Sequence, residues 1–173
     1  MNLSFRPAEE ADAEELCAIY APYVRDTAIS FEYVVPDISV FRKRIHDISQ
    51  SYPYLVAIGD DGSLVGYAYA STFHAREAYR FSAEMSIYVR GDVHGKGIGK
   101  ALYAEIEKRL KARGMVALYA CVAASPRKDD PYLTDASLRF HEKVGYHPCG
   151  LFSHCAIKFG LWYDMVYMEK ALY

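Results

Sequence analysis

The sequence predicts one α/β (α+β) domain over residues 1–173, built as a mixed sheet with helices on its faces. A length of 173 residues suits a single domain that can bury a sizeable core. Hydrophobic residues make up 52% of the chain and charged residues 24%, which is typical of globular proteins. The local patterns follow the order strand, two helices, three strands, helix, strand, helix and strand, which predicts the mixed class.

The N-terminal part of this order begins with a short strand in LSFRPA. Residues 9–24 are predicted to be helical because their apolar residues share one helical face. Pro22 is expected to end or kink that helix, because proline lacks the backbone N–H group. A second helix is predicted over residues 36–49, where Phe41, Ile45 and Ile48 form an apolar stripe.

The remaining elements are predicted in the same way, from the helical or strand periodicity of their apolar residues. Two β-prone runs flank the turn sequence GDDGS, so residues 54–72 are predicted to form an antiparallel hairpin. Gly114 and Gly145 suit the ends of two helices, because glycine readily adopts the left-handed conformation found there. The further elements are a strand over 81–89, a helix over 99–114, a strand over 115–123, a helix over 134–146 and a strand over 162–170.

Charge and cysteine usage exclude several classes of protein. The net charge of −2 gives no general attraction to nucleic acid or to membrane surfaces. The N-terminal residues lack the pattern of a signal peptide, no apolar run approaches a membrane span, and the four cysteines form no dense framework. We therefore expect a cytoplasmic protein with free thiols and no metal. A zinc site in HPCGLFSHC is the less favoured alternative, because the spacing of His147, Cys149, His154 and Cys155 fits no standard ligand pattern.

The segment VHGKGIGKAL, residues 93–102, carries the strongest local signal. It is not a Walker A loop, because Lys100 is followed by Ala101, and its G-x-G-x-G spacing differs from the Rossmann fingerprint. It nevertheless has two physical features in common with both phosphate-binding loops. Its glycines allow the backbone to approach a ligand closely, and the following helix offers free N–H groups to an anion. Lys96, Lys100 and Arg90 add positive charge. An ordinary glycine-rich turn is the alternative.

Together with its flanks, SIYVRGDVHGKGIGKAL resembles the acetyl-CoA loop of the GNAT N-acetyltransferases, whose pattern is R/Q-x-x-G-x-G/A. The segments AISFEYVVPD, FHAREAYRFSAEMSIYV, ASLRFHEKVGY and IKFGLWYDM are similar to the phosphinothricin and methionine-sulfoximine acetyltransferase branch, so the resemblance covers almost the whole chain. It implies the GNAT fold, a mostly antiparallel twisted sheet with a splayed central strand pair. It also implies transfer of an acetyl group from acetyl-CoA to the primary amine of a small amino acid-like molecule.

The resemblance implies an acetyl-CoA site along the strand and loop at residues 87–100. The pantetheine would pair with the backbone of the strand, and the pyrophosphate would lie on the loop. The sequence departs from the family at His94, where Arg or Gln is usual, and at Thr134, where Asn is usual. Thr134 directly follows PRKDDPYL, a segment that looks inserted relative to the family. The cofactor-binding residues implied are Ile87, Tyr88, Val89, His94, Gly95, Lys96, Gly97, Ile98, Gly99, Lys100, Thr134 and Ser137.

Two residues are expected to handle protons. Glu84 in SAEMSIYV matches the catalytic glutamate of the family and would deprotonate the amine, directly or through water. His141 in RFHEKVGY stands where many relatives offer a tyrosine to the leaving thiolate. An imidazole can transfer protons near neutral pH, although a structural role for His141 is an equal alternative.

The amine is expected to contact two segments. The run SFE supplies Phe31 and Glu32, and FHAREAY supplies Phe73, Arg76 and Tyr79. Arg76 can grip a carboxylate, phosphinate or sulfone oxygen with its planar fork, while the aromatic rings enclose a short aliphatic chain. The alternative for this second run is a charged surface loop.

Two other functions compete with acetylation of a small amino acid-like substrate such as phosphinothricin, methionine sulfoximine or methionine sulfone. One is acetylation of protein or peptide N-termini, and the other is a non-catalytic acyl-CoA sensor. The presence of Glu84 disfavours the sensor. Members of the family that this sequence resembles form dimers, so we also expect a homodimer.

Overall fold

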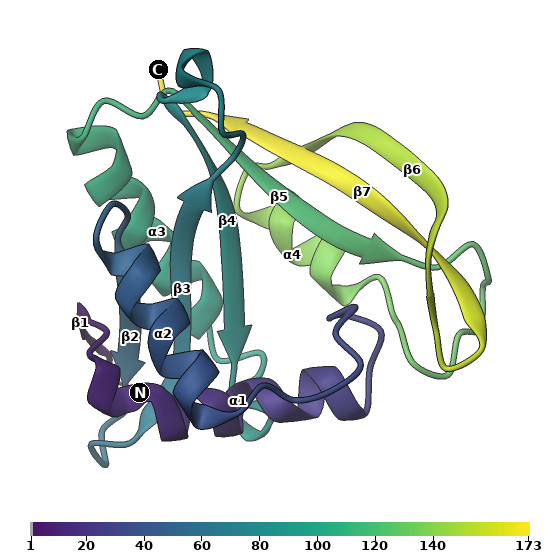
Figure 1. Cartoon of the computed structure of the whole chain (residues 1–173), viewed down its shortest axis with the longest axis horizontal. Coiled ribbons are helices and arrows are strands. Elements are labelled where there is room, and N and C mark those ends of the chain that lie inside the picture. The colour runs from purple at the N-terminus through teal and green to yellow at the C-terminus, as the bar shows by residue number, and fades with distance from the viewer. Residues whose placement is uncertain (1) are drawn as a thin grey trace.

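A computed structural model describes residues 2–173, which form one seven-stranded sheet with two α-helices against each face (Figure 1). The helices are α1 (Ala13–Arg25), α2 (Ile38–Ser49), α3 (Ile98–Ala112) and α4 (Ala136–Lys143), with short 3-10 turns at Glu10–Asp12, Glu77–Tyr79 and Gly91–Val93. The strands are β1 (Ser4–Pro7), β2 (Tyr54–Ile58), β3 (Leu64–Thr72), β4 (Ser82–Val89), β5 (Ala117–Ala124), β6 (His147–Lys158) and β7 (Leu161–Ala171).

The strand order is β1-β2-β3-β4-β5-β7-β6, and β4–β5 is the parallel pair within it. That pairing joins Ser82–Glu84 to Ala117–Tyr119 and then stops. From Met85 to Val89, β4 is paired on its β3 side only, and Figure 1 shows β4 and β5 diverging there. The prediction of a mostly antiparallel sheet with a splayed central pair is therefore confirmed.

Each face of the sheet has its own apolar core, as expected when amphipathic helices cover both sides. On the α3 side, Leu102, Ile106 and Leu110 recur every four residues and are fully buried. On the α1 and α2 side, Leu16 and Ile45 pack with other buried residues over β2 and β3. The two cores hold the helices in place and leave the diverging strands β4 and β5 as the opening in the sheet.

Two expectations about secondary structure were wrong. Pro22 does not end its helix, since it lies inside α1, which continues to Arg25. No separate strand was expected over His147–Lys158, yet this segment forms the edge strand β6. Its residues are mostly exposed and its register to β7 shifts twice, so the segment lacks the alternation by which strands are recognised.

The described residues 2–173 lack two features. No helix in this part of the chain has the length and apolar character needed to cross a membrane. No group of three or more His, Cys, Asp or Glu side chains among these residues could hold a metal ion. In the run that was considered for zinc, His147 instead pairs with Glu169 and His154 lies near Asp164.

Candidate active site

A groove of about 430 Å³ opens where β4 and β5 diverge, between the start of α3 and the side of α4. Most of its walls are apolar, and the glycine loop forms one end. Ten predicted cofactor residues line this groove or the adjoining cavity at its inner end. The lining of the groove is Tyr23, Ile29, Ile87, Val89, Val93, His94, Gly95, Gly97, Ile98, Gly99, Lys100, Ala136, Ser137, Phe140, Lys143 and Val144.

The glycine loop has the geometry of an anion cradle. Gly95 and Gly97 adopt φ values of +77° and +81°, a conformation that side chains disfavour. Gly97 is also the residue before α3, so the free N–H groups of the first helical turn follow it directly. Gly99 is needed for a different reason, because a Cβ atom there would lie 3.0 Å from the ring of Phe140. The loop can therefore hold a phosphate with backbone groups and the positive end of the α3 dipole.

The open edge of β4 carries backbone groups that no strand occupies. Successive residues of a strand direct their N–H and C=O groups to opposite sides, so Ile87 and Val89 face the groove and Tyr88 faces β3. In this structure Tyr23 Oη contacts both polar groups of Val89, and the Val89 N–H donates to it at 3.3 Å. His94 Nε2 lies 2.9 Å from the Val89 carbonyl oxygen and 2.9 Å from Tyr23 Oη.

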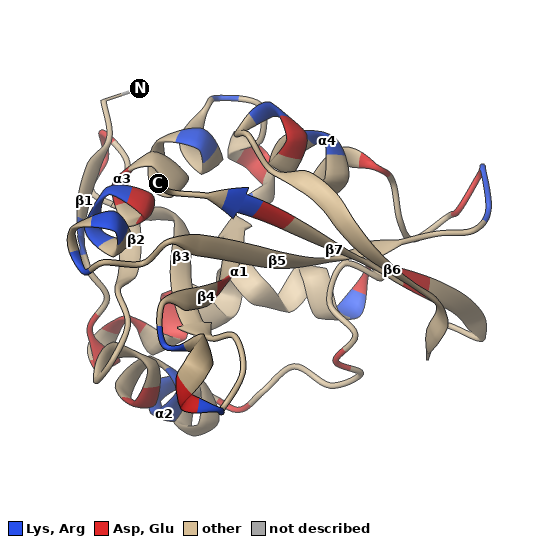
Figure 2. Ribbon diagram, turned by 90° about the horizontal axis from the view of Figure 1, so that it is seen from above, with Lys and Arg blue, Asp and Glu red and all other residues tan. Residues whose placement is uncertain are grey.

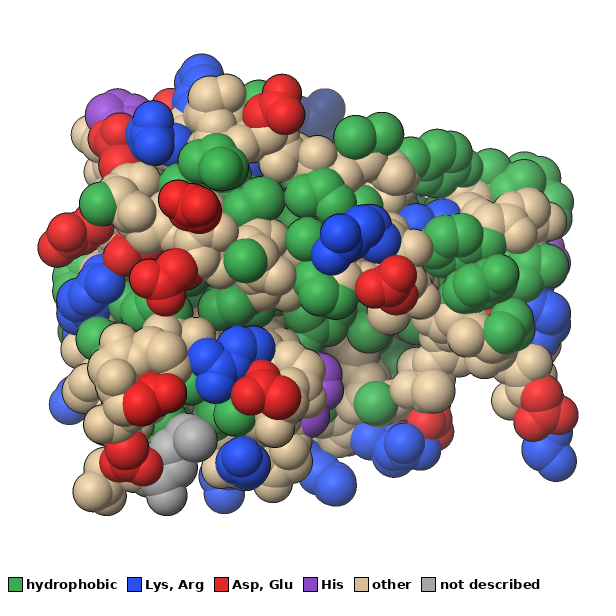
Figure 3. Space-filling model, turned by 90° about the horizontal axis from the view of Figure 1, so that it is seen from below, with side chains coloured by type: hydrophobic (Ala, Val, Ile, Leu, Met, Phe, Trp, Pro, Cys, Tyr) green, Lys and Arg blue, Asp and Glu red, His purple; other side chains and the backbone are tan. Residues whose placement is uncertain are grey.

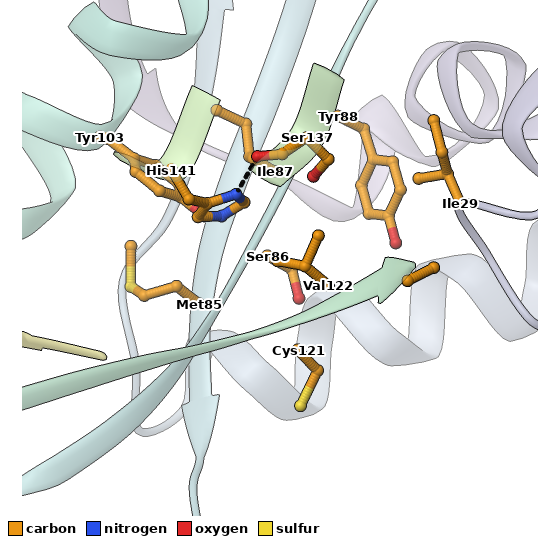
Figure 4. Close-up of a pocket in the computed structure, with 11 residues that line it drawn as sticks. Ile29, Met85, Ser86, Ile87, Tyr88, Tyr103, Cys121, Val122, Ser137 and His141 are labelled. Atoms are coloured by element: carbon orange, nitrogen blue, oxygen red, sulfur yellow. Dashed lines mark hydrogen bonds between the residues drawn. The ribbon is translucent and has the colours of Figure 1, made fainter. Parts of the chain in front are cut away.

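A smaller cavity of about 60 Å³ lies at the inner end of the groove (Figure 4). His141 and Tyr103 stand together on one wall, and Cys121 and Val122 come from β5 on the opposite side. His141 is only 4% exposed, its Nδ1 lies 2.8 Å from the Ser137 carbonyl oxygen, and its Nε2 lies 2.9 Å from Tyr103 Oη. Burial lowers the pKa of His141 below its ordinary value, so the ring is neutral at pH 7.

Glu84 lies at the point where the β4–β5 pairing ends, since it is the last β4 residue paired with β5. Its carboxylate is half-buried and accepts a hydrogen bond from the Cys121 thiol, with Sγ and Oε2 3.5 Å apart. Burial raises the pKa of this thiol to about 12, so Cys121 stays protonated and acts as a donor. A carboxylate at this position can take a proton from an amine that approaches the opening in the sheet.

Beside Glu84 on the same face of the sheet is a cluster of aromatic rings. Phe73 stacks on Tyr119 with ring centroids 4.0 Å apart and planes 11° apart. The Phe73 ring also meets Tyr79 and Tyr167 edge to face, at 5.8 and 6.2 Å. Arg76 lies in the exposed loop that follows Phe73, with its side chain in solvent. The stacked rings provide an apolar wall beside Glu84.

The other predicted substrate segment is held by a charged network. The Glu32 carboxylate pairs with both terminal nitrogens of Arg44 and accepts a hydrogen bond of 2.7 Å from Tyr20 Oη. Arg44 and Tyr20 lower the pKa of Glu32 despite its partial burial, so it is ionised at neutral pH. Buried Lys158 donates to the carbonyl oxygens of Val24, Thr27 and Ser30 at 2.6–2.8 Å, which fixes the loop that carries Phe31.

Comparison with known proteins agrees with this geometry. Residues 5–167 match the family described as acetyltransferase (GNAT) domain. The chain belongs to the GNAT acetyltransferase family. Phosphinothricin N-acetyltransferase of Alcaligenes faecalis is 36% identical over 168 residues, which cover 96% of this chain and 81% of that protein. The L-methionine sulfoximine/L-methionine sulfone acetyltransferase of Pseudomonas aeruginosa is 30% identical over 174 residues, with 99% and 96% of the two chains covered.

Solved structures of this family superimpose closely on the chain. A GNAT superfamily phosphinothricin acetyltransferase from Sinorhizobium meliloti, solved in complex with AcCoA, has a TM-score of 0.89 at 34% identity and covers 99% of this chain and 89% of its own. A ribosomal-protein-alanine N-acetyltransferase from Brucella melitensis has a TM-score of 0.88 at 32% identity, covering 98% and 99%. The chain is an acetyl-CoA-dependent N-acetyltransferase, as the sequence predicted.

Within this GNAT domain, some predicted site residues lie apart from the groove. Thr134 lies beside a separate hollow formed by residues 124–138, and Lys96 is exposed on the loop without lining the groove. Glu32 is occupied by Arg44 and Tyr20, so its first role in this structure is to hold its own loop.

Several residues that line the two cavities were not predicted from the sequence. Tyr23 lies in the helix predicted over residues 9–24 and was given no role at the site, and neither were Ile29, Tyr103, Cys121 and Phe140. Helical periodicity does identify Tyr103 as buried, because it follows Leu102 and precedes Ile106 on the inner side of α3. Periodicity does not show that its hydroxyl group ends beside His141.

Proposed function

We propose that this GNAT acetyltransferase acetylates the α-amino group of a small amino acid that carries a polar, oxygen-bearing side-chain group. Phosphinothricin, methionine sulfoximine and methionine sulfone are the acceptors that suit this description, and two relatives are named for them. The observation that carries the proposal is the position of Glu84, at the opening of the sheet and next to the aromatic wall around Phe73. A short aliphatic chain fits such a wall, and Arg76 in the exposed loop after Phe73 suits an anionic or strongly polar oxygen.

The proposed site binds acetyl-CoA along β4 and the glycine loop. The loop residues Gly95 and Gly97 have the conformations required for backbone contact with a pyrophosphate, and Ile87 and Val89 offer backbone groups to the pantetheine. The co-substrate supplies an activated acetyl group. Glu84 removes a proton from the incoming ammonium, and His141 is the residue available on the side of the leaving sulfur.

We further propose that the enzyme is a homodimer that works in the cytoplasm. Figure 2 shows that β6, at the edge of the sheet, carries almost no charged residue, and Figure 3 shows hydrophobic side chains gathered at the end of the molecule where the β6–β7 hairpin lies. Exposed apolar groups of this kind mark association surfaces. They include Leu151 (62% exposed), Phe152 (49%), Ile157 (44%) and Trp162 (50%). Four free cysteines suit a reducing compartment.

A panel of acceptors tests the proposed substrate class. Thiol release from acetyl-CoA is followed with phosphinothricin, methionine sulfoximine, methionine sulfone, ordinary methionine, a polyamine and a short peptide that begins with alanine. We expect the highest kcat/KM among the first three. The alanine peptide is included because a structural relative is named as a ribosomal-protein-alanine N-acetyltransferase. If that peptide or the polyamine is the only good acceptor, the small amino acid assignment is wrong.

The homodimer has its own test. Light scattering on the eluting protein gives its mass in solution, and Phe152→Glu together with Trp162→Glu places charge on the exposed face of the hairpin. We expect a dimer for the wild type and a monomer for the double variant. A monomeric wild type would contradict the proposal.

A further inference from the structure

The hydrogen bonds around His141 fix which of its nitrogens carries the proton. The Ser137 carbonyl oxygen can only accept, so Nδ1, which lies 2.8 Å away, must carry the hydrogen. Because burial lowers the pKa of the ring, the neutral form dominates, and Nε2 is then a lone pair. Tyr103 Oη, 2.9 Å from Nε2, must be the donor in that bond. The resting imidazole therefore presents no free N–H group to the cavity.

This assignment bears on how the leaving sulfur obtains its proton. Both ring nitrogens of His141 already take part in a hydrogen bond. Tyr103 Oη contacts Nε2, the nitrogen whose lone pair can take up a proton. Tyr103 is 1% exposed and lines the same cavity of about 60 Å³ as His141. The shortest route by which a proton can reach or leave Nε2 passes through the Tyr103 hydroxyl group. Direct donation from His141 to sulfur would require its bond to Tyr103 to break first.

We infer that Tyr103 and His141 act as one proton shuttle, in which the Tyr103 hydroxyl group faces the reacting atoms and His141 Nε2 stores the proton. The inference rests on the proposed function, because it needs an amine and a thioester in the cavity. It makes Tyr103 a catalytic residue and assigns His141 to a position behind it.

The shuttle moves one proton from nitrogen to sulfur in two balanced transfers. In the first, Tyr103 Oη takes a proton from the amine nitrogen that has bonded to the acetyl carbon, and passes its own proton to His141 Nε2. In the second, Nε2 returns that proton to Tyr103 Oη, which gives its other proton to the departing sulfur. The C–S bond breaks and an S–H bond forms, while Tyr103 and His141 return to their starting states. The ammonium has by then already lost its other proton to Glu84, which releases it to solvent.

The surroundings of the pair favour a neutral resting state. Apart from Tyr103, the titratable groups packed around His141 are Tyr146, which follows α4, and Cys121, which lines the far wall. Glu107 lies beyond Tyr103 on α3, accepts a hydrogen bond of 3.2 Å from Tyr146 Oη, and is paired with Lys170 Nζ at 2.7 Å. No carboxylate contacts the imidazole itself among the described residues, so nothing holds it as imidazolium.

Tyr146 provides a matched control for Tyr103. Both rings pack against the imidazole, with centroid distances of 5.5 Å in each case, and both are almost fully buried. The Tyr146 hydroxyl group bonds to Glu107 and not to His141. Tyr103→Phe and Tyr146→Phe therefore each remove one phenolic hydroxyl group from the same aromatic cluster. Only Tyr103→Phe removes the hydrogen-bond partner of His141 Nε2.

The experiment combines kinetics with a measurement that needs no turnover. We expect Tyr103→Phe to lower kcat by about 10²-fold, as is typical for loss of a general acid–base group, with unchanged calorimetric affinity for CoA. Tyr146→Phe is expected to keep kcat near the wild-type value. Nitrogen NMR of labelled histidine in the free wild-type protein should show His141 neutral, with the proton on Nδ1.

Each part has a result that would overturn the inference. Equal kcat values for the two variants, or a proton on Nε2 in the wild type, would do so, and the NMR result does not depend on whether Tyr103→Phe folds. An outcome in which the wild type acetylates no amine would instead remove the proposed function. The two failures are therefore distinguishable.

Discussion

The two sides of the proposed active site are built in different ways. The proposed co-substrate side is formed mainly by one continuous segment, residues 87–100, and the groups it offers are backbone N–H and C=O groups. The proposed amine side is formed by side chains from separate segments: Phe73 of the loop after β3 packs on Tyr119 of β5 and Tyr167 of β7, and Phe31 of the loop after α1 packs on Tyr163 of β7. One side depends on the path of the chain, and the other depends on which side chains the fold brings together.

This difference explains how each side can change. A backbone cradle tolerates substitution of its neighbours, so His94 can replace the usual Arg or Gln without loss of the φ values at Gly95 and Gly97. An aromatic wall changes shape with any single ring, because Phe73 contacts Tyr79, Tyr119 and Tyr167 at once. We expect substitutions on the co-substrate side to alter affinity for CoA, and substitutions on the amine side to alter the choice of acceptor.

The largest effect is expected for Glu84→Gln, at the boundary of the two sides. The amide keeps the shape of the side chain but cannot take the ammonium proton, so kcat/KM at pH 7 should fall by about 10²–10⁴-fold. The deficit should shrink at high pH, where more of the amine is already neutral. Steady-state kinetics with Glu14→Gln, an exposed site on α1, as the control provide the measurement. Wild-type activity in Glu84→Gln would remove Glu84 from the mechanism.

The next effect is expected for Gly97→Val on the co-substrate side. A β-branched residue at φ +81° is strained by about 1–3 kcal/mol, and its side chain would fill the space that a pyrophosphate needs. Affinity for CoA should fall by about tenfold or more. Gly114→Val is the matched control, because Gly114 has φ +82° at the other end of α3, and nothing lies within 4 Å of a Cβ atom at either position.

The control separates strain from ligand contact in this comparison. Both glycine variants should lower Tm, whereas only Gly97→Val should weaken CoA binding in a calorimetric titration. If a folded Gly97→Val protein binds CoA as tightly as the wild type, the glycine loop does not hold the pyrophosphate.

The same difference decides how much could be predicted from the sequence. The glycine loop and the strand before it were predicted from the sequence pattern, because a loop motif and its flanking elements are contiguous in the chain. The splayed strand pair was predicted only through the family resemblance. The stack of Phe73 on Tyr119 was not, because 46 positions separate the two residues and only the strand register brings them together. The bond between Tyr103 and His141 joins two helices and was missed for the same reason.

A third effect, limited to the amine side, is expected for Arg76→Ala. Arg76 is exposed, so its contact with a polar oxygen of the substrate is comparable with a surface ion pair and contributes about 1 kcal/mol, or roughly fivefold in kcat/KM. The loss should be seen with phosphinothricin and be absent with a simple amine. Arg80→Ala is the control, because Arg80 is in the same loop but lies over the Phe81 ring, 4.5 Å from its centroid. Equal losses with both acceptors would show that Arg76 does not select the substrate.

The smallest effect, and the only gain, is expected for Tyr23→Phe. In this structure Tyr23 Oη bonds to the N–H and C=O groups of Val89 that we assign to the pantetheine. A ligand that pairs with Val89 must displace this hydroxyl group, and a net hydrogen bond contributes about 0.5–1.5 kcal/mol, so its removal should tighten CoA binding by roughly threefold. The ring stays in place against Tyr88, whose centroid is 5.2 Å away, so the groove keeps its shape.

Tyr33→Phe is the matched control for this gain. Tyr33 Oη also donates to a backbone carbonyl, that of Ile157, but on the exposed β6 hairpin away from the groove. Calorimetric titration with CoA should show a lower Kd for Tyr23→Phe and no change for Tyr33→Phe. A higher Kd for Tyr23→Phe would mean that the hydroxyl group contacts the bound co-substrate, and that Tyr23 belongs to the binding site rather than competing for it.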